Sequence, residues 1–197
     1  MNIKFFPLLL VCGSLFMANV EAAEPFLPFI HAGDPKAPHT VELYWSPSCP
    51  QSALSYKDAF LPASIQYSAS GMVHFTAVMV ARNSEDVAFN RLLMCVPKDN
   101  FAGFSAAVMA GRIKDPNQTF ANVAQIGTRF GISSLSPEGC ASVTGDSIIK
   151  SLASRAIDQL KISETPAWFV DGKRIERLYF LRDLDTALAS VGVQVSK

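Results

Sequence analysis

The sequence predicts an α/β fold in which a small mixed sheet is flanked by helices and interrupted by a helical block. The predicted elements follow the order strand, helix, strand, several helices, β-hairpin and helix, which fits one small sheet with helices packed against it. The 197 residues are 49% hydrophobic and only 17% charged, a composition that readily forms a packed core. The formal net charge is +0, so bulk electrostatics favour no nucleic-acid partner.

Residues with high β-propensity mark the strands. The segments HTVELYW at 39–45, VHFTAVMVA at 73–81 and AWFV at 167–170 are rich in β-branched and aromatic residues. Asp171-Gly172 is a hairpin turn signal, and it predicts a short partner strand at 173–175.

Helical segments fill the intervals between these strands. Pro50 suits the first turn of a helix that we expect to continue from Gln51 to about Phe60 and to end near Pro62. The segments 87–94, 101–113, 119–130 and 146–160 form the predicted helical block. The segment 181–191 closes the chain as an amphipathic helix with an apolar stripe of Leu181, Leu184, Leu188 and Val191.

The N-terminus has the anatomy of a secretory signal peptide. Lys4 precedes an apolar stretch at 5–17, and either Val20-Glu21-Ala22 or Glu21-Ala22-Ala23 offers a small-residue cleavage site. The apolar stretch is shorter than the ~20 residues that a membrane span needs. We therefore expect a signal peptide at 1–23, a proline-rich extended arm at 24–38, no membrane span after cleavage, and a periplasmic or otherwise secreted protein.

Export changes what the cysteines imply. Removal of Cys12 with the signal peptide leaves Cys49, Cys95 and Cys140. An odd number in an oxidising compartment implies one free or intermolecularly reactive thiol. The simplest arithmetic pairs Cys95 with Cys140 and leaves Cys49 alone; two buried thiols, or a bridge from Cys49 to Cys95, are the alternatives.

Two motifs and the order of the elements resemble the DsbA-like branch of the thioredoxin superfamily. Ser46-Pro-Ser-Cys-Pro-Gln-Ser52 lies at a strand-to-helix junction and is similar to the family's Cys-Pro-X-Cys motif. The segment ETPAWFVDGK at 164–173 resembles the family's loop with a cis proline, which leads into a hairpin. The resemblance implies a thioredoxin fold built from 39–82 plus 161–197, with an all-helical insertion at 83–160 between the second strand and the cis-proline hairpin.

The resemblance also implies a site for thiol-disulfide exchange. Cys49 would be the nucleophile, because a helix N-terminus stabilises its thiolate. Thr165 and Pro166 would bind the substrate backbone, with Pro50 and Gln51 beside them. Relatives with a second disulfide inside the insertion make the Cys95–Cys140 pairing plausible.

This chain departs from the family pattern at two positions. Ser52 stands where the family has its second cysteine; its hydroxyl would donate a hydrogen bond to the thiolate but cannot release a mixed disulfide. Release then needs an outside thiol, from the substrate or from a small thiol such as glutathione. Leu43 stands where many members have an acidic residue, and Glu42, one residue away, faces the other side of a strand.

The expected partners are secreted proteins with cysteines or a membrane redox partner, and no resident cofactor is expected. A metal site is not supported, because His31, His39 and His74 have no ligand spacing. One alternative function is a redox-inactive binding or chaperone-like protein, for which Ser52 is the best argument. A further alternative is an enzyme like the kappa-class glutathione transferases, which share a helical insertion and a Ser-Pro motif after the first strand.

Overall fold

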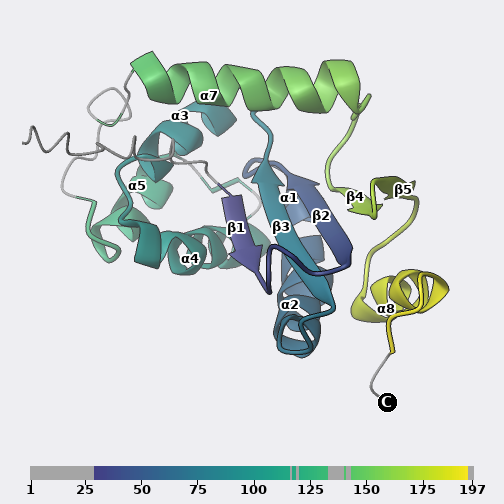
Figure 1. Cartoon of the computed structure of the whole chain (residues 1–197). Coiled ribbons are helices and arrows are strands. Elements are labelled where there is room, and N and C mark those ends of the chain that lie inside the picture. The colour runs from purple at the N-terminus through teal and green to yellow at the C-terminus, as the bar shows by residue number, and fades with distance from the viewer. Residues whose placement is uncertain (1–28, 116, 119, 133–139, 141–142, 195–197) are drawn as a thin grey trace, which may run out of the picture.

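The computed structural model describes residues 29–194 except 116, 119, 133–139 and 141–142 (Figure 1). The expected signal peptide at 1–23 and the first part of the arm lie outside the described residues. Across the part of the chain that is described, no helix has the length and apolar character needed to cross a membrane.

A five-stranded sheet forms the centre of the molecule, in the order β1-β3-β2-β4-β5. Strands β2 and β3 run parallel, and the other neighbouring pairs run antiparallel. The strand bounds are Phe29–Ala32 for β1, His39–Trp45 for β2, Val73–Met79 for β3, Ala167–Val170 for β4 and Lys173–Ile175 for β5.

Strand β1 lies within the segment that the sequence predicts as an extended arm. It pairs with β3 at the edge of the sheet. The turn after it depends on Gly33, which has φ +90, and a Cβ there would lie 2.4 Å from the carbonyl oxygen of Val73. A strand of four residues is too short to show a clear period in sequence, so only its pairing reveals it.

The helix after β2 is longer than predicted. It comprises α1 (Pro50–Ser55), a π-helical turn η1 (Tyr56–Phe60) and α2 (Leu61–Ser68). The prediction that it ends near Pro62 was wrong. The π turn, closed by the N–H of Leu61 donating to the carbonyl of Tyr56, restarts the helix so that Pro62 falls in the first turn of α2, where its missing N–H costs no hydrogen bond.

The alternation of side chains along the strands divides the core into two clusters. Leu43, Trp45, Phe75 and Trp168 pack against α1, η1, α2 and the terminal helix α8 (Leu181–Ser190). Tyr44, Val78 and Phe169 point to the opposite face, toward Leu152 of α7 (Val143–Ser154) and Ala156 of the π-helical turn η3 (Arg155–Gln159). In Figure 1, α7 runs along the top of the view, and α8 lies at the lower right, below β4 and β5.

The helical insertion lies between β3 and β4. Its helices are α3 (Ser84–Leu93), the short 3-10 turn η2 (Lys98–Asn100), α4 (Phe101–Lys114), α5 (Phe120–Thr128) and α7. Helices α3, α4 and α5 gather at one end of the sheet, while α7 returns toward β4 (Figure 1). The predicted α/β fold with a helical insertion is confirmed; the boundaries at 82/83 and 160/161 stay predictions.

Candidate active site

Cys49 occupies the N-cap of α1, directly after the loop that follows β2. Its backbone is extended (φ −95, ψ 113), and Pro50 takes the first helical position. The N–H of Cys49 donates to the carbonyl of Ser46 at 3.1 Å, which closes the turn between strand and helix. Among the described residues, Cys49 is the cysteine outside a disulfide, and its side chain is half-buried.

The loop of Thr165 and Pro166 lies against this cysteine. Strands β2 and β4 are antiparallel with Tyr44 opposite Ala167, so the residues after β2 meet the residues before β4. The Thr165–Pro166 peptide bond is cis. The Sγ of Cys49 donates to the carbonyl oxygen of Thr165 at 3.2 Å. The fold thus brings together the two motifs that the sequence places at opposite ends of the domain.

Ser52 is fully buried one turn into α1. Its Oγ accepts a hydrogen bond from the N–H of Ser46 at 3.3 Å. An accepting hydroxyl keeps its own hydrogen for donation, but the structure records no hydrogen bond from Ser52 to the Sγ of Cys49. The thiolate-stabilising role of Ser52 stays a prediction.

A groove of about 570 Å³ opens beside the cis-proline loop. Gln51, Thr165 and Pro166 line one part of it, and residues after β5 line another. Pro50 is exposed but does not line the groove. A smaller groove of about 150 Å³ shares Gln51 and is bordered by Leu54, Tyr179 and Phe180. Of the expected substrate-binding residues, Gln51, Thr165 and Pro166 therefore line one groove, and Pro50 lies outside it.

Charged side chains of both signs border the larger groove. Arg174 pairs with Glu176 at 2.9 Å, which neutralises it locally. Arg177 and Glu164 are exposed on the same groove. The backbone of Arg177 is left-handed (φ 59), a conformation unfavourable for a residue other than glycine. The groove therefore carries an exposed cation and an exposed anion beside the cis-proline loop.

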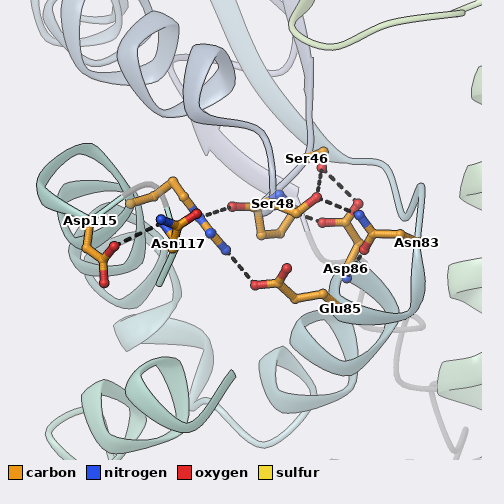
Figure 2. A network of polar contacts seen from close by, with 9 residues as sticks. Ser46, Ser48, Asn83, Glu85, Asp86, Asp115 and Asn117 are labelled. Carbon is orange, nitrogen blue, oxygen red and sulfur yellow. Dashed lines mark hydrogen bonds and ion pairs between the residues drawn. The ribbon is translucent and has the colours of Figure 1, made fainter. Parts of the chain in front are cut away.

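A buried polar network supports the loop before Cys49, and sequence reasoning missed it. Asp86 of α3 and Arg112 of α4 contact this loop, as Figure 2 shows for Asp86 with Ser46 and Ser48. Asp86 resembles an ordinary acidic residue in the first turn of a helix, so no local signal identifies it. An arginine in the otherwise apolar segment FAGFSAAVMAGRI is a signal that could have indicated a buried polar contact.

The face that β2 presents to α1 carries no carboxylate. Leu43 is fully buried on that face, and Glu42 lies on the other, where the hydroxyl of Tyr44 donates to it at 3.4 Å. Burial and the neighbouring Glu42 raise the pKa of Tyr44 to about 12. The carboxylate that does contact the cysteine motif comes from Asp86, on a different element.

The other two cysteines in the described part of the chain are joined to each other. Cys95, just after α3, and Cys140 form a disulfide with a Cα–Cα distance of 5.3 Å. This is the pairing that the cysteine arithmetic favours, and it leaves the thiol of Cys49 without a partner cysteine among the residues that the structure describes.

The three histidines of the sheet do not gather at one place. His39 pairs with Asp171 at 2.9 Å, and His31 and His74 stack with ring centroids 5.3 Å apart. Within the described residues, no three side chains of His, Cys, Asp or Glu are grouped as metal ligands would be.

Comparison with known proteins shows to which family this architecture belongs. The family model described as Thioredoxin matches residues 28–189, which is most of the chain. The chain belongs to the thioredoxin family. This thioredoxin-family chain has no match among curated protein sequences.

Solved structures define which form of the thioredoxin fold is present. A protein-disulfide isomerase from Novosphingobium aromaticivorans is 18% identical with a TM-score of 0.67, over 84% of this chain and 98% of that one. The alpha-DsbA1 of Wolbachia pipientis is 20% identical with a TM-score of 0.66, over 84% and 92%. The oxidised BdbD of Bacillus subtilis is 16% identical with a TM-score of 0.65, over 83% and 92%. This thioredoxin-family chain therefore has the DsbA-like fold.

Proposed function

We propose that this protein is an exported thiol-disulfide exchange protein that works with one cysteine. The observation that carries the proposal is the contact between the Sγ of Cys49 and the carbonyl of Thr165 at 3.2 Å, in a chain whose position 52 is serine. A thiol at a helix N-terminus beside a cis-proline loop suits attack on a disulfide. The signal peptide expected at 1–23 supports action outside the cytoplasm.

The exchange step balances without any further oxidant. The thiolate of Cys49 attacks one sulfur of a substrate disulfide, a new S–S bond forms, and the second substrate sulfur leaves as a thiolate with the bonding electrons. Cys49 is oxidised to a mixed disulfide, and the leaving half is reduced. An outside thiol then attacks the mixed disulfide, because the hydroxyl of Ser52 cannot.

The proposed substrates are secreted proteins with cysteines, a membrane redox partner, or a small thiol such as glutathione. A substrate chain would pair with the backbone of Thr165 in extended conformation. The carbonyl of Thr165 accepts the Cys49 thiol in the free protein, so an arriving substrate N–H competes for that oxygen. Gln51 and the groove beside Pro166 would contact residues next to the substrate cysteine.

The decisive experiment is thiol titration of the mature protein with mass mapping, followed by incubation with oxidised glutathione. One fast-reacting thiol at Cys49, a Cys95–Cys140 bridge and a gain of one glutathione are expected. The Cys49→Ser variant is the matched control and should gain none. A slow Cys49, or a bridge from Cys49 to Cys95, would contradict the one-cysteine mechanism.

A redox-inactive binding protein is the second candidate. The exposed side chains of Leu54, Tyr179 and Phe180 around the smaller groove favour it, since apolar surface can hold unfolded segments. This candidate predicts that the Cys49→Ala variant protects an aggregating client as well as the natural protein does. Light scattering of a cysteine-free client separates the two functions.

A further inference from the structure

We infer that Asp86 and Arg112 are positioning residues for Cys49, so that the helical insertion sets the geometry of disulfide exchange. This inference rests on the proposed function. It concerns residues that belong neither to the cysteine motif nor to the cis-proline loop.

Asp86 joins two loops that follow neighbouring parallel strands. Its side chain is fully buried. One carboxylate oxygen accepts the hydroxyl of Ser46 at 2.8 Å and the N–H of Arg82 at 2.9 Å, and the other accepts the N–H of Ser48 at 3.0 Å. The loop after β2 is thereby tied to the loop after β3 (Figure 2).

Arg112 holds the residue between the two serines. Its side chain is 4% exposed, its Nε donates to the carbonyl of Pro47 at 3.1 Å, and its guanidinium pairs with Glu85 at 2.5 Å. Ser46, Pro47 and Ser48 are therefore each bound by a side chain of the insertion, and the next residue is Cys49. Three consecutive contacts leave this loop little freedom to shift.

The carboxylate of Asp86 is not needed to cap its own helix. The side chain of Asn83 accepts the N–H of Asp86 at 2.9 Å and so caps α3. Asn83 also donates to the hydroxyl of Ser48 at 2.8 Å. Because a buried carboxylate is costly unless fully hydrogen-bonded, the three donors that face Asp86 define its position closely.

Ser46 transmits this position to the reacting sulfur. Its carbonyl accepts the N–H of Cys49, and its N–H donates to the Oγ of Ser52. A shift of Ser46 would move both residues of the proposed site. Disulfide exchange needs the attacking sulfur aligned with the bond that breaks, whereas alkylation by a small reagent needs access alone, and misplacement by about 1 Å can cost a large factor in rate.

The test compares these two reactions in the folded mature protein. Asp86→Asn keeps the shape but turns one amide donor toward the N–H of Ser48 or Arg82. We expect its rate with oxidised glutathione to fall about tenfold while its rate with iodoacetamide changes less than about twofold. Asp146→Asn is the matched control, since Asp146 pairs with Arg91 elsewhere in the insertion, and both of its rates should stay unchanged.

Ser46 variants keep the inference testable if Asp86→Asn fails to fold. Ser46→Ala removes one of the three donors, and Ser46→Thr restores the hydroxyl. We expect the ratio of the exchange rate to the alkylation rate to fall in Ser46→Ala and to return to the natural value in Ser46→Thr. The equilibrium constant for the mixed disulfide between Cys49 and glutathione should shift in parallel with that ratio.

Two outcomes would overturn the inference. One is an unchanged ratio in Asp86→Asn and Ser46→Ala; the other is an equal fall of both reaction rates, which would indicate a general loss of structure. If Cys49 of the natural protein forms no mixed disulfide at all, the proposed function fails instead. If the natural protein forms the mixed disulfide but the ratio of the two rates is unchanged in the variants, the positioning role is refuted and the proposed function is not.

Discussion

The Sγ of Cys49 lies 3.2 Å from the carbonyl oxygen of Thr165, although 116 positions separate the two residues in the chain. This contact joins the helix N-terminus that stabilises a thiolate to the loop whose backbone a substrate can reach. Four predictions follow from the surroundings of these two residues and from the core that supports them.

Replacement of Ser52 by cysteine should create a two-cysteine site. The new thiol lies one turn from Cys49 within α1, so its attack on a mixed disulfide becomes intramolecular. We expect release of bound glutathione to become roughly tenfold faster or more in the absence of an outside thiol. Mass spectrometry of the quenched reaction measures it. The double variant Cys49→Ser with Ser52→Cys serves as the control, and two persistent free thiols in oxidising buffer would contradict the prediction.

Replacement of Arg177 by glutamine should slow exchange with anionic disulfides selectively. Arg177 borders the groove beside Pro166. An exposed charge pair contributes up to ~1 kcal/mol, and loss of that energy corresponds to a roughly two- to fivefold slower rate with a dicarboxylate disulfide. The rate with neutral hydroxyethyl disulfide should stay constant. Arg182→Gln, an equal charge change on an 82% exposed side chain outside that groove, is the control. Equal slowing by both variants would show long-range electrostatics instead.

Replacement of Ser55 by alanine should destabilise the core next to the site. The indole N–H of Trp168 donates to the Oγ of Ser55 at 2.9 Å, and both residues are buried. Loss of that acceptor leaves a buried donor unpaired, which costs about 1–3 kcal/mol of unfolding free energy. Ser64→Ala on the same helical segment is the control, because Ser64 donates to a helix carbonyl and its loss leaves no donor unpaired. Urea unfolding measures both, and equal losses would refute the argument.

Stability should fall on acidification partly through Asp171. Partial burial alone would raise the pKa of this carboxyl, but hydrogen bonds from His39 and from the N–H of Thr40 outweigh burial and lower the pKa below its usual value. A group with a lowered pKa in the folded state stabilises the protein above its unfolded pKa, and this contribution is lost as the pH falls through the folded pKa. Urea unfolding measured from pH 6 downward should therefore show a fall in the free energy of unfolding below about pH 4.

The variant Asp171→Asn tests this assignment. Its unfolding free energy should depend less steeply on pH below about pH 4 than that of the natural protein, because one carboxyl no longer titrates. Asp99→Asn, at an exposed carboxyl of η2, is the control for the charge change itself. Identical slopes for the natural protein and Asp171→Asn would contradict the prediction.

Much of the fold and of the proposed site could be predicted because its signals are local. The β-branched runs, Pro50 at a helix start and the Asp171-Gly172 turn each constrain a few neighbouring residues, and the strands at 39–45, 167–170 and 173–175 agree with the structure. The sequence also places Cys49 and Thr165-Pro166 at the ends of strands that the fold makes neighbours. Its limit shows at Pro62, where a π turn overrides the usual effect of proline.

The sequence by itself determined the order of the elements, the position of Cys49 at a helix start and the absence of a cysteine at Ser52. Only the tertiary structure decided that Phe29–Ala32 completes the sheet and that Asp86 holds the loop before Cys49. Glu85 and Asp86 are adjacent acidic residues at the start of α3, and local sequence does not distinguish them. Which one turns inward depends on where the ends of β2 and β3 bring their unpaired donors, and that is a property of the packed sheet.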